Sequence, residues 1–456
     1  MKRLIALVAA TLLSASNAAA QSLAGDWLGT LDTGALKLRL VFHVTDTPKG
    51  PTATVDSLDQ NARGIPVTRL SRDGSSVRME LAGIGGTFIG KIDDAGKTIA
   101  GTWTQGAGSL PLTISRATDS TPFEPRRPQN PRRPYAYDEG EVTYNSRASG
   151  VRLAATLTLP NAKGPFPAVV LITGSGPQDR DESIVGHKPF LVLADYLTRR
   201  GFAVLRADDR GVGKSTGDFS TATTADFAAD AEGGLAFLQT LSDIDHRKIG
   251  LIGHSEGAVI ASMVAARNPA VAFIVMLSGT GVRGDEIILA QSELIAAAAG
   301  AGREQIEKNR TVQREALALL VQEKDDARLE SKLRTTLSGQ IPESQLGGQL
   351  KTLMSPWYRY FIAYDPAPAL RQVTVPVLAI NGEKDLQAPS KQNVPAIRAA
   401  LEAGGNRNIE IVELPGLNHL LQTAPTGSPS EYGQIEETMA PLALEKIATW
   451  LARVAR

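Results

Sequence analysis

The sequence predicts an α/β protein: a parallel sheet covered by helices on both faces, preceded by a small all-β domain that is a barrel or a sandwich. From residue 138 onward, short continuous apolar runs alternate with helical segments, as in sheets buried on both faces. Residues 21–120 instead alternate apolar and polar residues between Gly, Asp and Pro turns, which is typical of antiparallel strands. Residues 121–137 repeat proline at every third position among four arginines, which favours a stiff, solvated polyproline II linker.

The composition is that of a soluble globular protein, and it excludes several classes of function. The 456 residues suffice for two or three domains. Lys and Arg total 48, as do Asp and Glu, so we expect no attraction to nucleic acid or anionic lipid. The chain contains no cysteine, which excludes disulfides, a thiol nucleophile and cysteine-ligated metal.

The first twenty residues predict export. Lys2 and Arg3 precede a short apolar stretch at 4–13, and three alanines at 18–20 give an Ala-x-Ala cleavage pattern before Gln21. We therefore expect a signal peptide over residues 1–20 and a periplasmic or secreted mature protein. No later segment has the roughly 18 unbroken apolar residues of a membrane span.

The motif Gly-x-Ser-x-Gly at 253–257 lies between a predicted strand at 249–252 and a predicted helix at 258–266. A serine on so tight a turn needs unusual backbone angles, and glycines on either side leave room for the turn. This geometry exposes the Ser255 hydroxyl as a candidate nucleophile. It also directs the amide of Glu256, at the start of the helix, toward an oxyanion formed there.

A serine hydroxyl needs a base to accept its proton, and the chain contains five histidines. His43 lies in the other domain, and His246 precedes the nucleophile strand, at the opposite end of the sheet. His254 is adjacent to the serine and cannot easily turn back toward it, whereas His187 lies in the loop after an earlier strand. We therefore predict His419, directly after the last strand, as the base.

The base needs an acid that fixes its tautomer and stabilises the imidazolium. Asp385 follows the strand at 377–380 and precedes a predicted helix. Glu383 is the alternative, but it is closer to the strand end, where we expect its side chain to point away. The second oxyanion donor should come from the loop at 173–178, where we place it at Ser175, with Gly174 as the alternative.

Residues 283–364 interrupt the alternation of strands and helices and predict a helical cap over the active site. Helical segments are expected at 287–299, 304–327 and 349–354. The aromatic cluster at 357–361 either lines an acyl or aryl pocket or anchors the cap to the core.

Two charged clusters, at 179–182 and 208–210, could bind a divalent metal, but we expect their carboxylates to pair with arginine and hold the loops. The segment 211–216 resembles a phosphate-binding loop. That motif requires glycine where Asp208 stands, so nucleotide binding is excluded. We therefore expect no metal and no cofactor.

Together these motifs resemble the α/β-hydrolase superfamily and, more narrowly, bacterial EstD-like serine esterases, in which a small β domain precedes a capped hydrolase domain. The motifs are at 173–182, 208–215, 253–257, 381–385 and 417–419. The resemblance implies an α/β-hydrolase fold with an inserted helical cap and carboxylesterase activity on short acyl esters. It also implies Ser255, Asp385 and His419 as the catalytic triad, in the chain order of that superfamily.

The sequence thus predicts an exported serine esterase that acts on a small-molecule ester through an acyl-enzyme. Two alternatives stay open. One is a peptidase, amidase or thioesterase that uses the same triad, and the other is a catalytically inert protein that binds the cell envelope. Cleavage of aminoacyl naphthylamides would indicate the first, and failure to react with a fluorophosphonate probe would indicate the second.

Overall fold

The computed structural model describes residues 22–33, 37–60, 62–106, 108–118, 127–148, 150–341 and 343–455. The predicted signal peptide at 1–20 and the first part of the predicted linker, at 121–126, lie outside these residues. The chain divides into two compact units, Met1–Phe123 and Glu124–Arg456.

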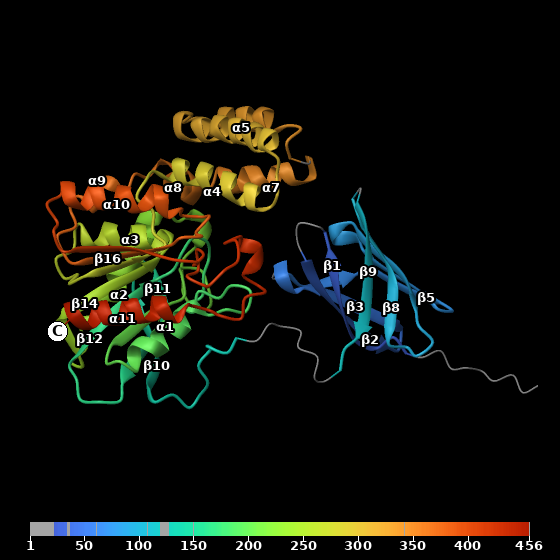
Figure 1. Ribbon diagram of the computed structural model, residues 1–456, viewed down its shortest axis with the longest axis horizontal. Helices are drawn as coiled ribbons and strands as arrows, with labels where there is room; N and C mark the ends of the chain where they lie inside the picture. Colours follow the sequence, from blue (N-terminus) through green and yellow to red (C-terminus); the bar gives the residue numbers. More distant parts are fainter. Residues whose placement is uncertain are drawn as a thin grey trace, which may run out of the picture. The chain divides into compact units, whose positions relative to one another are not determined.

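The first unit is a single antiparallel sheet of nine strands among its described residues, in the order β4-β3-β2-β1-β9-β8-β7-β6-β5. The strands are β1 (Gly25–Asp32), β2 (Lys37–Thr47), β3 (Gly50–Ser57), β4 (Ala62–Val67), β5 (Arg69–Asp73), β6 (Ser76–Leu81), β7 (Gly86–Ile92), β8 (Thr98–Gln105) and β9 (Gly108–Arg116). Only Thr68 separates the two edge strands in the chain, so the sheet curls until it is nearly closed (Figure 1). Of the two predicted architectures, this is the barrel rather than the sandwich.

The core of this first unit explains its alternating sequence. Side chains of one face of the sheet, among them Trp27, Phe42, Phe88 and Trp103, form one buried cluster. Their neighbours along each strand point to the outer face, because the side-chain period of a strand is two residues. The residues of this unit therefore account for a stable fold of its own.

The second unit contains an eight-stranded sheet, in the order β10-β11-β13-β12-β14-β15-β16-β17. The strands are β10 (Tyr137–Asn145), β11 (Arg152–Pro160), β12 (Phe166–Ile172), β13 (Ala203–Ala207), β14 (Ile244–His254), β15 (Ile274–Leu277), β16 (Val377–Gly382) and β17 (Ile409–Leu414). Strands β12 to β17 run parallel, whereas β10 and β11 pair antiparallel at one edge. The parallel sheet predicted from residue 138 onward is confirmed.

Helices cover both faces of this sheet (Figure 1). One face carries α1 (Pro189–Thr198) and α11 (Pro441–Val454), and the other carries α2 (Thr224–Leu238), α3 (Glu256–Ala265) and α10 (Ser390–Ala403). On β14, Leu251 packs against the helices α2, α3 and α10, whereas the next residue, Ile252, packs in the core beneath α1 and α11. Strands buried on both faces are apolar throughout, which confirms the α/β-hydrolase fold that the sequence predicts.

The inserted segment consists of α4 (Gly284–Ala298), α5 (Arg303–Gln322), α6 (Asp326–Leu337), α7 (Glu343–Leu353) and α8 (Pro356–Ala363). The single helix expected at 304–327 is wrong: two helices occupy this region. The chain breaks because Asp325 caps α6, where its side chain accepts a hydrogen bond from the Arg328 amide. These helices share a leucine-rich core of their own that includes Leu329 and Leu333.

The C-terminal part of the predicted linker is bound to the second unit rather than solvated. The Arg127 guanidinium donates hydrogen bonds to the carbonyl oxygens of Val185, Gly433 and Ile435 at 2.7–3.1 Å. Gln129 donates to the Met439 carbonyl at 2.7 Å. Residues 128–129 form a turn in which the Asn130 amide donates to the Arg127 carbonyl oxygen at 3.1 Å, so this part of the linker is not the extended polyproline II that the sequence predicts.

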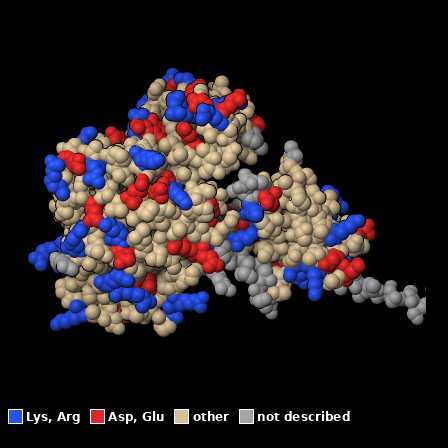
Figure 2. Space-filling model, viewed as in Figure 1, with Lys and Arg blue, Asp and Glu red and all other residues tan. Residues whose placement is uncertain are grey.

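No helix within the described residues is both long enough and apolar enough to cross a membrane. Lys and Arg side chains are interspersed with Asp and Glu over the visible face of the helical cap (Figure 2). This pattern accords with the balance of 48 basic and 48 acidic residues in the sequence.

Candidate active site

The turn between β14 and α3 has the strained geometry that its sequence predicts. Ser255 has φ 54° and ψ −116°, a conformation that side-chain-bearing residues rarely adopt. A Cβ atom at Gly253 would lie 1.9 Å from the Gly257 carbonyl oxygen, and one at Gly257 would lie 2.1 Å from that of Ile172. The two glycines are therefore required by close backbone approach, and the surrounding sheet and helix hold the serine in its strained state.

Two backbone amides near Ser255 are available to an oxyanion. Glu256 is the first residue of α3, where an amide has no acceptor within the helix. Among the hydrogen bonds between described residues, neither the Glu256 amide nor the Ser175 amide serves as a donor. Both residues line one cavity with Ser255, so both fit the role that the sequence suggests for them.

The alternative oxyanion donor, Gly174, is wrong. Its amide donates to the Glu182 carboxylate at 2.7 Å. The hydrogen atom is thereby directed at a buried side chain and is not available to a substrate. Sequence spacing could not distinguish the amides of Gly174 and Ser175, because their directions depend on this contact between separate parts of the loop.

The structure joins His419 to Asp385 and not to Glu383. His419 Nδ1 lies 2.9 Å and 3.0 Å from the two Asp385 carboxylate oxygens. The Asp385 side chain is fully buried, and its Oδ1 also accepts from the amides of Gln387 and Ala388. Glu383 instead accepts from the Gly416 amide at 2.8 Å. With Nδ1 donating to Asp385, Nε2 of His419 is the free acceptor that a general base needs.

Ser255 and His419 line the same cavity, which has a volume of about 400 Å³. No hydrogen bond between described residues joins the Ser255 hydroxyl to His419. Such contacts are often long in substrate-free enzymes and tighten when substrate binds. The structure therefore places Ser255 and His419 along the wall of one cavity that is large enough for a small molecule.

The aromatic cluster at 357–361 serves both of the roles that the sequence left open. Trp357 and Phe361 line the cavity, with ring centroids 5.8 Å apart. Tyr358 packs into the core of the cap. The Trp357 indole also donates to the Glu256 carboxyl group of α3 at 3.0 Å, so α8 both anchors the cap to the sheet domain and forms an apolar wall of the cavity.

His254 forms a buried ion pair that the sequence did not reveal. Its Nδ1 lies 2.9 Å from Glu182 Oε1, and its Nε2 lies 2.9 Å from the backbone carbonyl oxygen of His419. Burial opposes the positive charge, but the Glu182 carboxylate outweighs it and raises the pKa of His254 to about 9. Both ring nitrogens face acceptors, so the ring is an imidazolium. It cannot act as a base, although it touches the residue that can.

Glu256 carries a buried carboxyl group that joins four elements. It accepts from Thr224 Oγ1 at 2.7 Å, from Ser175 Oγ at 2.8 Å and from Trp357 Nε1 at 3.0 Å. Burial raises its pKa. The residue after the nucleophile therefore connects α3 to α2, to the cap and to the loop that carries Ser175.

The two charged clusters mostly hold loops, as the sequence suggests. Arg180 pairs with Asp208 at 2.7 Å, whereas Asp209 accepts from Thr173 Oγ1 at 2.8 Å. Burial raises the pKa of Asp209 to about 8. Within the described part of the chain, no three His, Cys, Asp or Glu side chains converge on a point where a metal ion could bind.

The remaining histidines have structural partners. His187 is buried between Thr438 Oγ1 and the Tyr432 carbonyl oxygen, and burial lowers its pKa to about 4. His43 lies in the first unit between Asp26 and Asp56. His246 is exposed and lies 3.0 Å from the Leu241 carbonyl oxygen.

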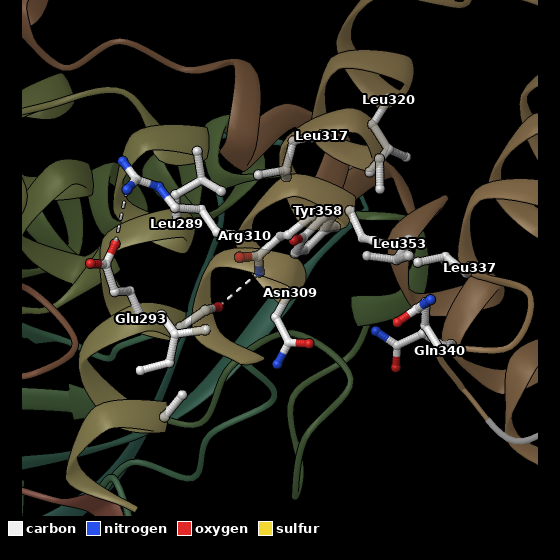
Figure 3. Close-up of a pocket in the computed structure, with 17 residues that line it drawn as sticks. Leu289, Glu293, Asn309, Arg310, Leu317, Leu320, Leu337, Gln340, Leu353 and Tyr358 are labelled. Atoms are coloured by element: carbon white, nitrogen blue, oxygen red, sulfur yellow. Dashed lines mark hydrogen bonds and ion pairs between the residues drawn. The ribbon is translucent and has the colours of Figure 1, made fainter. Parts of the chain in front are cut away.

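A second cavity, of about 360 Å³, lies entirely within the cap (Figure 3). Five leucines contribute to its wall, and Arg310 faces Glu293 at one end, 3.7 Å away. Its lining includes no histidine, and Ser292 there is bonded to Gln313 rather than to a base. This cavity lacks the nucleophile and base that the first one contains.

Comparisons with known proteins identify the family of the chain. A sequence model of the family described as X-Pro dipeptidyl-peptidase (S15 family) matches residues 149–409, a range that holds Ser255 and Asp385 and ends before His419. Esterase EstD of Thermotoga maritima is 26% identical over 327 residues, which cover 70% of this chain and 69% of that protein.

Solved structures of similar fold were also found. An esterase of Pyrococcus furiosus is 15% identical, with a TM-score of 0.44, covering 70% of this chain and 92% of that one. A hypothetical protein of Pseudomonas aeruginosa is 19% identical, with a TM-score of 0.44, covering 74% of this chain and 98% of that one.

Proposed function

Since the chain belongs to the X-Pro dipeptidyl-peptidase (S15) family of hydrolases, we propose that it is an exported serine carboxylesterase that cleaves esters of short acyl chains. The observation that carries this proposal is the convergence of two groups on one cavity. Ser255 lies there on a strained, glycine-flanked turn, and His419 lies there with Nδ1 bound to the buried Asp385. The esterase relative over most of the chain favours an ester as the substrate.

In the proposed reaction, Ser255 Oγ attacks the ester carbonyl carbon while His419 Nε2 accepts the hydroxyl proton. Asp385 stabilises the imidazolium through Nδ1, and the amides of Glu256 and Ser175 bind the oxyanion. His419 then donates the proton to the leaving alcohol, and the acyl group stays on Ser255. A water molecule, deprotonated by His419, releases the acid and restores the serine. Every step uses groups of this chain, and no cofactor takes part.

The substrate class follows from the cavity. Its volume of about 400 Å³ is at the lower end of the range for small-molecule sites. Trp357, Phe361 and Ile287 supply apolar surface beside Ser255, which suits a short acyl chain. The described lining includes neither lysine nor arginine, and the one cation there, the His254 imidazolium, is already paired with Glu182.

The test is hydrolysis of p-nitrophenyl acetate and p-nitrophenyl butyrate by the purified chain and by Ser255→Ala. We expect the variant to lose activity and labelling by a fluorophosphonate. Ser220→Ala, which changes an exposed serine of the same unit, serves as the control and should match the wild type. Equal rates for wild type and Ser255→Ala would reject the proposal.

A second candidate is a peptidase that cleaves after proline, and the description of the family favours it. The same triad would form the acyl-enzyme from an amide, with an amine as the leaving group. Comparing Ala-Pro p-nitroanilide with p-nitrophenyl butyrate separates the two. A higher kcat/KM for the anilide would replace the esterase proposal with the peptidase one.

Export is supported by the sequence of residues 1–20. We expect the mature chain to begin at Gln21 when a bacterium with two membranes produces the full chain. Mass spectrometry of the periplasmic fraction tests this, and a full-length chain in the cytoplasm would contradict it.

A further inference from the structure

We propose that two buried carboxylates, Glu182 and Glu256, are positioning residues that hold the loop at 173–175 so that the Ser175 amide faces the oxyanion. This inference rests on the proposed function and extends it to two side-chain carboxyl groups that take no part in any step of the reaction. The two carboxyl groups hold the Ser175 amide in place without accepting a hydrogen bond from its N–H.

Three successive residues of this loop each bind a different carboxylate. Thr173 Oγ1 donates to Asp209 at 2.8 Å, the Gly174 amide donates to Glu182 at 2.7 Å, and Ser175 Oγ donates to Glu256 at 2.8 Å. A loop of small residues has many conformations of similar energy, so contacts of this kind select one of them. The amide of Ser175 is the group of the loop that these bonds leave unused.

The Glu182 carboxylate acts on two parts of the proposed machinery at once. One of its oxygens accepts the Gly174 amide and also lies 2.9 Å from His254 Nδ1. His254 in turn contacts the His419 carbonyl oxygen at 2.9 Å. The loop that carries one oxyanion donor and the backbone of the base are therefore joined through a single buried ion pair.

Glu256 fixes the distance between the two oxyanion donors. Its own amide is one donor, and its side chain binds the hydroxyl of Ser175, whose amide is the other. Thr224 and Trp357 hold the same carboxyl group from α2 and from the cap. Because three donors converge on this group, it has little freedom to move away from Ser175.

The charges in this region agree with a positioning role. A bare carboxylate beside an oxyanion would oppose its formation, so these groups must be compensated. The His254 imidazolium compensates the charge of Glu182. Burial raises the pKa of Glu256, which favours the neutral form of its carboxyl group. At Glu182 one oxygen makes both contacts, so an amide there can keep them, whereas at Glu256 both oxygens accept and an amide would lose one acceptor.

The experiment measures kcat and KM for p-nitrophenyl butyrate, and Ki for a trifluoromethyl ketone that forms a tetrahedral adduct with Ser255. For Glu182→Ala we expect kcat to fall about 100-fold, as when one oxyanion donor is lost, with KM within about threefold of wild type. Ki should rise by the factor by which kcat/KM falls. Glu182→Gln should recover to within about fivefold, because its amide oxygen can accept from both the Gly174 amide and His254 Nδ1, as one carboxylate oxygen does in the wild type.

Glu141→Ala is the matched control. Glu141 pairs with Arg180 of the same segment, but its side chain is 65% exposed and contacts none of residues 173–175. Its kinetics should equal those of the wild type. An unchanged kcat in Glu182→Ala, or an unchanged Ki with a reduced kcat, would overturn the inference.

Ser175→Ala removes one hydroxyl, keeps the amide and decides the matter if Glu182→Ala fails to fold. We expect kcat/KM to fall about tenfold and Ki to rise equally, since the loop loses its bond to Glu256. Wild-type values in Ser175→Ala would overturn the Glu256 contact. A wild-type chain that neither hydrolyses esters nor reacts with a fluorophosphonate removes the proposed function itself. An active wild type with unaffected variants removes only the positioning role.

Discussion

Asp385→Asn is expected to lower kcat about 10,000-fold, because the surrounding donors force the asparagine into one orientation. Oδ1 of Asp385 accepts from the amides of Gln387 at 2.9 Å and Ala388 at 2.8 Å, whereas Oδ2 faces only His419. The asparagine oxygen must therefore take the Oδ1 position, because two buried amides would otherwise lose their acceptor.

The asparagine NH₂ group then faces His419 Nδ1, which must become an acceptor. The imidazole proton moves to Nε2, where it blocks removal of the Ser255 proton. A 10,000-fold loss corresponds to about 5.5 kcal/mol in the activation barrier. KM should stay within about twofold, because the buried side chain at 385 does not line the cavity.

The assay is steady-state hydrolysis of p-nitrophenyl butyrate at pH 7.5, with thermal unfolding measured alongside. Glu383→Gln is the matched control, since Glu383 contacts the Gly416 amide instead of His419. Its kcat should stay within about twofold of wild type. If Glu383→Gln abolishes activity while Asp385→Asn keeps more than a tenth of it, the assignment of the acid is refuted.

Three further predictions concern stability. Gly257→Ala should lower the free energy of unfolding by at least about 1–3 kcal/mol, because its Cβ would lie 2.1 Å from the Ile172 carbonyl oxygen. The control Gly347→Ala, in open space on α7, should raise the free energy of unfolding by up to about 1 kcal/mol. Equal melting temperatures for the two variants would contradict this prediction. The pKa of Asp209 is about 8 when folded and 3.8 as the ordinary value, so its contribution is full below pH 3.8 and is lost as pH rises through 8. Asp209→Asn should therefore gain stability relative to wild type between pH 5 and pH 8 in urea unfolding, and a constant difference would count against the raised pKa. Leu329→Ala, at a fully buried position of the cap, should cost about 2–5 kcal/mol and expose the cap to proteolysis before the sheet; simultaneous cleavage of both would show that the cap does not unfold first.

The sequence by itself predicted the fold class and the residues that the structure brings together at the candidate site. Apolar runs such as 249–252 fit only a strand buried on both faces, because period and composition report burial directly. The pairing of His419 with Asp385 followed from the rule that the ends of parallel strands meet at one edge of the sheet. The glycines around Ser255 could be interpreted because their effect is local to five residues.

The tertiary structure alone decided how the side chains of distant segments pair. The sequence excluded His254 as the base because it lies beside Ser255. In the structure, Glu182, 72 positions away, pairs with the His254 ring, and the ring also contacts the backbone carbonyl oxygen of His419. Gly174 and Ser175 look equivalent in the sequence, but the contact with Glu182 removes one amide from use. Hydrogen-bond direction and burial depend on atoms brought together by the whole fold, and no pattern within a short stretch of sequence records them.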